Sequence, residues 1–335
     1  MEQIENNNMI IEELAYKGAT KIYGKQLSNA VKERLNNELK SIIDNNFSGI
    51  YLVSQKLVEK SNKDGYIVGI RGSIGSSLVA YCLGITEVDP IKYEIPFEVF
   101  AGFNGDKEPD VNLTFAKEYK LNIDTDVPDE IKILESKLST ILHKLQAETG
   151  IDPTTISLDD KETLNIICSA DTIDIPEFET EDVRNIILET KPTNFDDLVK
   201  INALSHSTNA WEENAEYLIK DGIATFQEVI TSRDDIMIYL MEMGISRETS
   251  FDIMEYVRKG KARKNKDILW EEYKTIMTDH NVPEWYISSC EKIMYLFPKA
   301  HCVGYVINAF RIAWYKVHYP EAFYKVYDEV KLNRK

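Results

Sequence analysis

The sequence predicts an α+β fold that is mostly α-helical. Apolar residues recur every three or four positions over most of the chain, whereas the short alternating runs typical of strands occur only between about residues 66 and 119. With 335 residues, 43% of them hydrophobic, the chain can bury a sizeable core and can form more than one domain.

Charge and cysteine content exclude several classes of protein. Lysine and arginine total 39 against 56 aspartates and glutamates, a formal charge of −17, so any contact with nucleic acid must be local. No CxxC pair occurs, which argues against a zinc site and a disulfide framework and predicts a reducing, cytoplasmic location; the four cysteines are Cys82, Cys168, Cys290 and Cys302. No segment has the composition of a signal peptide or a membrane span, so no membrane is expected as a partner.

The N-terminal segment, residues 1–62, is predicted to be helical. The first periodic stretch runs from Leu27 to Asp44 and carries an apolar stripe of Leu27, Val31, Leu35, Leu39 and Ile42. The second runs from Ile50 to Ser61 and ends in the polar turn SNKDG.

Residues 63–125 contain the predicted β-structure. YIVGI, beginning at Tyr66, is typical of a strand, RGSIGSS of a glycine-rich turn, and SLVAYCLGI of a helix that closes at Gly84. The alternating runs EIPFEVF and PDVNLTF follow, as expected of a small sheet.

Residues 126–190 are predicted to form an acidic helical bridge, and residues 191–335 a large helical subdomain. Between Leu121 and Glu189 the chain has seventeen acidic and five basic residues. Helical spacing predicts one long helix from Pro128 to Glu148, and nearly every segment after Lys191 has the same periodicity.

The glycine-rich turn is the first candidate site. Glycines let backbone N–H groups converge at a helix N-terminus, where the helix dipole favours anions. Ser73, Ser76 and Ser77 add hydroxyl groups, and Arg71 adds a positive charge suited to a phosphate oxygen. The alternative is a plain tight turn with serine caps.

The strand PDVNLTF is the second candidate, because Asp110 and Asn112 alternate and so share a face. A D-x-D pair on a strand suits two-metal nucleotidyl transfer, since two carboxylates hold magnesium ions about 3.5 to 4 Å apart. Here the second position is an amide, which offers only a neutral oxygen. The alternative is a surface aspartate and asparagine on an edge strand.

Two further segments are candidates for binding. A basic run could contact a phosphate backbone or could simply solvate a helix end; it comprises Arg258, Lys259, Lys261, Arg263, Lys264 and Lys266. A later helix begins with Lys299 and His301, followed by Tyr305 one turn on, which could meet a nucleotide or could be a packed helix start. The histidines have no zinc-ligand spacing, and neither a GxSxG motif nor a P-loop occurs.

Taken in order, these segments resemble the PolC-type DNA polymerase III alpha subunits of low-GC Gram-positive bacteria. Five blocks carry the resemblance: IYLVSQKLVEKSNKDGYIVGIRGSIGSSLVAYCLGITEVDP, IPFEVFAGFNGDKEPDVNLTFAKEY, LSHSTNAWEENAEYLIKDG, RDDIMIYLMEMG and VPEWYISSCEKIMYLFPKAHCVGYVINAFRIAWYKVHYP. They span most of residues 15–327.

The resemblance implies a palm of the polymerase-beta-like nucleotidyltransferase type with helical fingers, which copies template DNA in replication. It implies Mg²⁺, or Mn²⁺, at Asp110, with primer-template DNA and replisome proteins as partners. It also implies that the incoming deoxynucleoside triphosphate (dNTP) meets Lys299 and His301 in the fingers and is held in the palm by Arg71, Gly72, Ser73, Gly75 and Ser76. The family's cysteine-rich zinc segment, which would fall between Pro90 and Glu94, is missing here, so no zinc is expected.

Two departures from the family pattern concern the metal ligands. The family strand reads PDIDLNF, with two metal-binding aspartates, whereas this chain has Asn112 at the second position. The family takes a third carboxylate from a later strand, KLDILGHDD, after a long palm segment that is expected to be deleted here. If KLNI, beginning at Lys120, is the remnant of that strand, Asn122 replaces the third aspartate and Asp124 is a displaced substitute.

Two hypotheses about function stay open. The first is a shortened palm-and-fingers polymerase that still transfers nucleotides, with Asp110 and Asp124 as ligands. The second is a homologue with a degenerate active site that binds nucleotide or primer-template DNA as an accessory factor or competitor. The amide at Asn112 favours impaired catalysis, because two-metal chemistry depends on negative charge around the ions.

Overall fold

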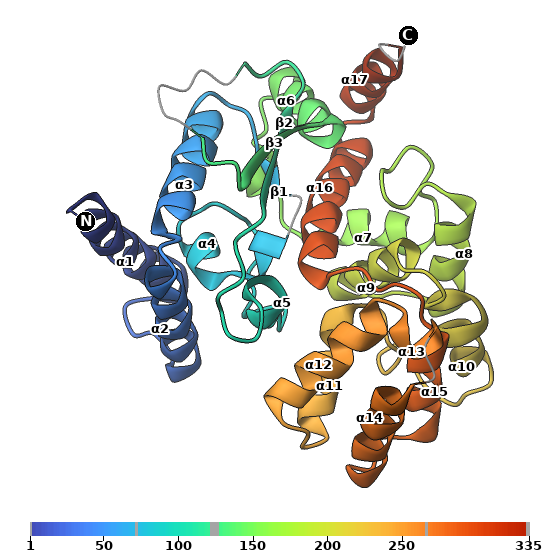
Figure 1. The fold of residues 1–335 in the computed structure, drawn as a ribbon. Helices are drawn as coiled ribbons and strands as arrows, with labels where there is room; N and C mark the ends of the chain where they lie inside the picture. Colours follow the sequence, from blue (N-terminus) through green and yellow to red (C-terminus); the bar gives the residue numbers. More distant parts are fainter. Residues whose placement is uncertain (1, 71–72, 121–126, 265–266, 333–335) are drawn as a thin grey trace. The chain divides into compact units, whose positions relative to one another are not determined.

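The structure is a computed structural model that describes residues 2–70, 73–120, 127–264 and 267–332 (Figure 1). The chain divides into two compact units. The first unit combines Met1–Thr163 with Val303–Lys335, and the second unit is Leu164–Cys302. The mostly helical α+β fold predicted from the sequence is confirmed.

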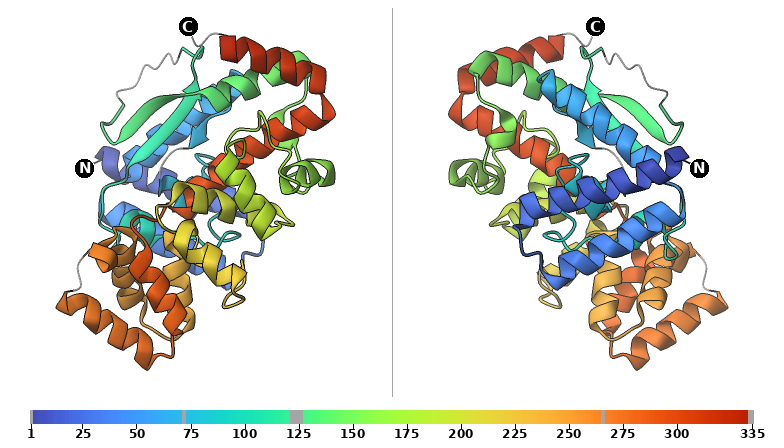
Figure 2. Two further views of the ribbon diagram at one scale, coloured as in Figure 1. Left: turned by 90° about the vertical axis from the view of Figure 1, so that its right-hand side faces the viewer. Right: turned by 90° about the vertical axis from the view of Figure 1, so that its left-hand side faces the viewer.

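The first unit begins with three helices, α1 (Glu2–Tyr23), α2 (Asn29–Asp44) and α3 (Ser48–Lys63). Helix α1 lies against α2 and α3, as Figure 2 shows, and also contacts the short helix α4 (Leu78–Cys82). Ser28 caps α2 by accepting a hydrogen bond from the backbone N–H of Val31. The two helices predicted within residues 1–62 are therefore confirmed.

A three-stranded sheet carries the predicted palm residues. Its order is β1 (Gly69–Ile70), β2 (Val111–Ala116) and β3 (Ile131–Ser136), with β1 antiparallel and β3 parallel to β2. Val111, Leu113 and Phe115 are buried in one core with α1 to α4. Because side chains alternate along a strand, the residues between them belong to the opposite face. The strand predicted at PDVNLTF is confirmed.

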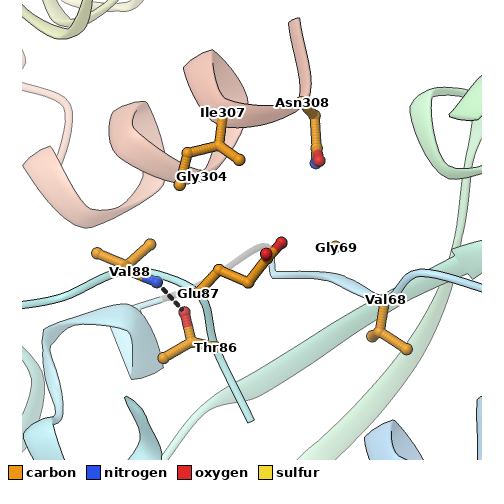
Figure 3. A pocket seen from close by; sticks show the side chains of 8 residues that line it. All are labelled: Val68, Gly69, Thr86, Glu87, Val88, Gly304, Ile307 and Asn308. Carbon is orange, nitrogen blue, oxygen red and sulfur yellow. Dashed lines mark hydrogen bonds between the residues drawn. The ribbon is translucent and has the colours of Figure 1, made fainter. Parts of the chain in front are cut away.

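The opposite face of β2 is covered at one end only. Asp110 is exposed, Asn112 half-buried and Thr114 buried. At the covered end, a β-carbon on Gly69 would lie 2.4 Å from Thr114 Oγ1 and 3.6 Å from Asn308 Nδ2 of α16 (Lys299–His318), so glycine permits this close approach. Figure 3 shows the small pocket at this place, lined by Val68, Gly69, Thr86, Glu87, Val88, Gly304, Ile307 and Asn308. Polar side chains at the start of β2 are thus left accessible.

A second core within the first unit joins helices from distant parts of the chain. Helix α6 (Lys137–Thr149) packs against α17 (Pro320–Leu332), and the core also includes residues of α16. Arg311 of α16 is buried and forms two hydrogen bonds of 2.7 Å to the carboxylate of Glu87. This bidentate ion pair fastens α16 to the segment that follows α4.

The regular elements among the described residues of the second unit are helices, apart from one isolated bridge between Thr208 and Tyr295. Its elements are α8 (Glu181–Thr190), α9 (Phe195–His206), the π-helix η3 (Trp211–Ala215), α10 (Glu216–Lys220), α11 (Arg233–Glu242), α12 (Arg247–Arg258), α13 (Lys261–Lys264), α14 (Ile268–Asp279) and α15 (Glu284–Lys292). The remaining elements of the chain are η1 (Ser73–Ser76), α5 (Glu98–Ala101), η2 (Pro153–Thr155) and α7 (Lys161–Cys168), the last of which crosses the boundary between the units.

Two predicted elements are wrong. The helix predicted from Pro128 to Glu148 is a strand followed by a helix, because Ile131 and Ile133 alternate in β3 and α6 starts only at Lys137, after the cap Ser136. Parallel pairing with β2 stabilises the strand, and that pairing is not visible in local periodicity. EIPFEVF, predicted as a strand, contains helix α5 instead.

The boundaries of the two compact units, at 163 and 302, differ from those predicted at 62, 125 and 190. The four-part division remains a prediction about functional parts. Among the helices that the structure describes, none combines the length and the apolar character required to cross a membrane.

Candidate active site

Strands β2 and β3 bring three polar residues together at the accessible end of the sheet. Asp110 directly precedes β2, and Asn112 is its second residue. In the parallel register, Asn112 stands opposite Lys132 of β3. Paired residues in adjacent strands have side chains on the same face, so Asn112 and Lys132 are neighbours there.

Lys132 forms an ion pair with the predicted metal ligand. Its Nζ lies 3.0 Å from Asp110 Oδ1, and the side chains are 58% and 54% exposed respectively. An ammonium group therefore holds a carboxylate oxygen that the family resemblance assigns to a metal ion. Sequence reasoning missed Lys132 because the third-carboxylate strand was sought at KLNI.

The described residues contain a second candidate for that strand. The parallel neighbour of β2 is β3, with the sequence IKILES, followed at once by α6. Ile133 and Leu134 resemble the IL of the family's KLDIL, so the equivalence of Lys132 with the family's third aspartate is a prediction. Asn122 and Asp124 lie outside the described residues. The shared IL was the signal that could have identified Lys132.

These residues do not fit a magnesium or manganese site. Both ions prefer clustered oxygen ligands with negative charge, whereas this set consists of one carboxylate, one amide and one ammonium. Within the described ranges, no group of three or more His, Cys, Asp or Glu side chains could hold a metal ion.

The glycine-rich turn folds as the 3₁₀-helix η1 and leads into α4. Ser77 caps α4 by accepting a hydrogen bond from the N–H of Ala80. Gly75 and Ser76 are buried, Ser73 is half-buried, and the Ser76 hydroxyl has no hydrogen-bond partner among the described residues. Arg71 and Gly72 lie outside the described residues. The predicted serine caps are confirmed at Ser77, and the predicted dNTP role of this turn stays a prediction.

Glu38 of α2 occupies the N-terminus of α4. This buried carboxylate accepts hydrogen bonds from the N–H groups of Leu78 (3.0 Å) and Val79 (3.1 Å) and from Ser77 Oγ (2.8 Å). Arg34 pairs with Glu38 and also donates to the carbonyl oxygen of Ser76 at 2.7 Å. These N–H groups, which the sequence offered for a phosphate, are used within the protein. The helical pattern of α2 gave no signal for this role of Glu38.

Lys299 and His301, the predicted fingers residues, belong to the second unit. The N–H of Lys299 donates to Asp234 Oδ2 at 2.8 Å, and its Nζ lies 3.9 Å from Asp235 Oδ1. Burial raises the pKa of the Asp234 carboxyl. The His301 ring packs edge-on against Phe297. Lys299 is thus anchored to the start of α11, and its predicted role at the nucleotide stays a prediction.

The described part of the basic run lies at the end of α12 and in α13, whereas Lys266 lies outside the described residues. Arg258 and Lys259 both form ion pairs with Glu255. Burial alone would raise the pKa of the Glu255 carboxyl, but the hydrogen bonds and charges of the two basic residues outweigh burial and lower this pKa to about 2. The ammonium of Lys261 lies 5.5 Å from the Tyr256 ring centre, and Arg263 donates to a backbone carbonyl at 2.6 Å. We call the exposed members the basic patch: Lys259, Lys261, Arg263 and Lys264.

Comparison with known families covers both units. Residues 9–130 match the bacterial DNA polymerase III alpha NTPase domain, and residues 133–281 match the finger domain of the same subunit. The PolC-type DNA polymerase III of Caldanaerobacter subterraneus subsp. tengcongensis is 34% identical to this chain, and the match covers 98% of this chain. The chain belongs to the DNA polymerase III alpha family. The resemblance inferred from the sequence is confirmed.

PolC-type DNA polymerases III of Staphylococcus epidermidis and Clostridium perfringens are 33% and 32% identical, again over 98% of this chain. The chain covers 34%, 33% and 33% of these three relatives, so it spans about a third of their length. The match to the first extends over 486 residues, more than the 335 of this chain, so that relative contains segments that this DNA polymerase III alpha-like protein lacks.

Proposed function

We propose that this DNA polymerase III alpha-like protein acts in DNA replication by binding primer-template DNA, as an accessory factor or competitor, without nucleotidyl transfer. One observation carries the proposal: Lys132 Nζ lies 3.0 Å from Asp110 Oδ1, with Asn112 opposite Lys132. A cytoplasmic location and replisome partners remain predictions from the family resemblance.

The physical reason is the charge of the metal site. Two-metal transfer needs carboxylates that neutralise the ions bridging the attacking and leaving oxygens. Asp110, Asn112 and Lys132 together carry no net charge. Because removal of a single group that stabilises a transition state slows an enzyme by about 10²–10³-fold, an amide and an ammonium at two ligand positions should abolish measurable transfer.

Primer extension tests the loss of chemistry. Wild-type protein with a primer-template and dNTPs, in Mg²⁺ or Mn²⁺, should give no extended product, while fluorescence anisotropy should detect DNA binding by the same preparation. The matched pair is Asp110→Ala and the double variant Asn112→Asp/Lys132→Asp, which restores the family's carboxylates. Extension by the wild type that Asp110→Ala abolishes would contradict the proposal and support the active-polymerase hypothesis.

The basic patch supports DNA as the ligand, because it concentrates exposed cations in a chain of charge −17. Neutralising Lys261 and Arg263 to alanine should weaken binding and reduce its salt slope by about 0.9 for each phosphate that the protein no longer neutralises. The control is Lys40→Ala/Lys56→Ala, which removes two exposed lysines from α2 and α3. Equal salt slopes for the two double variants would remove the basic patch from the interface.

A further inference from the structure

We infer that the accessible end of the sheet is a direct phosphate-binding site in which Lys132 and Asn112 bind the anion without a metal ion. This inference rests on the proposed function, since it explains how a palm without metal ligands keeps hold of nucleic acid or nucleotide. The ligand is a phosphate group, either of a DNA backbone or of a dNTP.

Lys132 has the charge and the access that the site requires. A lysine ammonium carries three donor hydrogens, and Asp110 Oδ1 at 3.0 Å accepts one of them. The side chain is 58% exposed, so the other hydrogens can reach an incoming oxygen. The ion pair also restrains a long, flexible side chain, which lowers the entropy lost when the ligand binds.

Asn112 contributes a second donor on the same face. It stands opposite Lys132 in the register of β2 and β3 and is half-buried. Its amide NH₂ can donate to a phosphate oxygen, whereas an aspartate in its place has only acceptors. The aspartate would also add a second negative charge beside Asp110, which the single charge of Lys132 would not offset. The amide therefore suits the same ligand as the ammonium.

Both differences from the family pattern change the site in the same direction. Three carboxylates attract cations and meet a phosphate only through them, whereas Asp110, Asn112 and Lys132 are neutral together and offer donors to the anion. A single loss of a metal ligand would leave a weakened metal site. An amide and an ammonium, side by side, convert it into a site for the anion itself.

The test measures binding in the absence of divalent metal, with fluorescence anisotropy as the readout. Two probes are used separately: a labelled primer-template duplex and a fluorescent dATP analogue. Each is titrated with wild-type protein in EDTA and in MgCl₂ at equal ionic strength. The variants are Lys132→Met, Lys132→Arg as the conservative replacement, and Lys56→Met as a control at an exposed lysine of α3.

Wild-type protein should bind equally well in EDTA and in MgCl₂. Lys132→Met should weaken binding about tenfold, the effect of one charge-assisted hydrogen bond, while Lys132→Arg and Lys56→Met stay near wild type. Weakening with the duplex alone assigns the phosphate to DNA, and weakening with the dATP analogue alone assigns it to the nucleotide. If Lys132→Met binds both probes like wild type, or if binding requires Mg²⁺, the inference is overturned.

These outcomes separate the two proposals. Wild-type protein that binds neither probe refutes the proposed function, and primer extension refutes it independently. Wild-type protein that binds without extending a primer, but equally well with methionine at position 132, refutes only the phosphate site. Circular dichroism of each variant confirms that the fold is intact, which the exposure of Lys132 leads us to expect.

Discussion

Replacing Glu38 should destabilise the first unit more than its position on a regular helix suggests. The carboxylate is 0% exposed and accepts hydrogen bonds from two backbone N–H groups, the Ser77 hydroxyl and the Arg34 guanidinium. Glu38→Ala leaves these donors unsatisfied and the Arg34 charge without its partner. Breaking a buried pair of this kind costs about 3–5 kcal/mol of unfolding free energy.

Glu38→Gln keeps the shape and one acceptor but removes the charge, so it should lose about 1–3 kcal/mol. The control is Glu33→Ala, an exposed position on the same helix, which should change stability by less than about 0.5 kcal/mol. Urea unfolding, monitored by circular dichroism, gives the free energies of unfolding of Glu38→Ala, Glu38→Gln and Glu33→Ala. Hydrogen exchange then shows whether amides of α4 open first in Glu38→Gln. Equal stability of Glu38→Gln, Glu38→Ala and Glu33→Ala would refute the argument that Glu38 holds α4.

Three other substitutions test particular features of the structure. Gly260→Ala should lower the free energy of unfolding by about 2–4 kcal/mol, because the φ of Gly260 is +68° and a β-carbon there would lie 2.4 Å from a backbone oxygen. The control Gly222→Ala, at φ +67° with open space around the β-carbon, should lower it by only about 1 kcal/mol. Similar melting temperatures of the two variants would contradict this prediction. Glu255 has a pKa of about 2, below its ordinary 4.5, so it adds stability above pH 4.5 that is lost as the pH falls towards 2. Glu255→Gln should therefore flatten the acid unfolding curve in that window, and an unchanged curve would exclude this role. Glu87→Ala should cost about 2–4 kcal/mol in urea unfolding, because it leaves the buried Arg311 unpaired; a loss equal to that of Glu87→Gln would argue against the ion pair.

Sequence patterns predicted elements that local periodicity determines. The stripe of Leu35, Leu39 and Ile42 predicted α2, since the periodicity of a helix acts between neighbouring residues. The run YIVGI and the turn after it predicted β1 and α4, although the strand is limited to Gly69–Ile70. The same reasoning missed β3, because Ile133 and Leu134 also fit a helical stripe and only pairing with β2 decides between them. The prediction for Pro128–Glu148 therefore followed the helical spacing of the apolar residues and not their two-residue alternation in Ile131 and Ile133.

The candidate site was predicted in part for a related reason. Asp110 and Asn112 were found from the spacing within one strand. Lys132 is twenty positions beyond Asn112 in the chain and becomes its neighbour only through the parallel register. Glu38 escaped notice because an acidic residue on an amphipathic helix is ordinarily exposed, and its burial depends on donors from α4.

The division of the chain has a consequence for synthesis on the ribosome. The second unit is one uninterrupted stretch, Leu164–Cys302, inserted into a first unit whose other part, Val303–Lys335, is made only afterwards. While the inserted unit emerges and can fold, the second core of the first unit is incomplete, because α16 and α17 have not yet been synthesised. Late arrival of these two helices means that residues translated after the insertion complete a core begun before it.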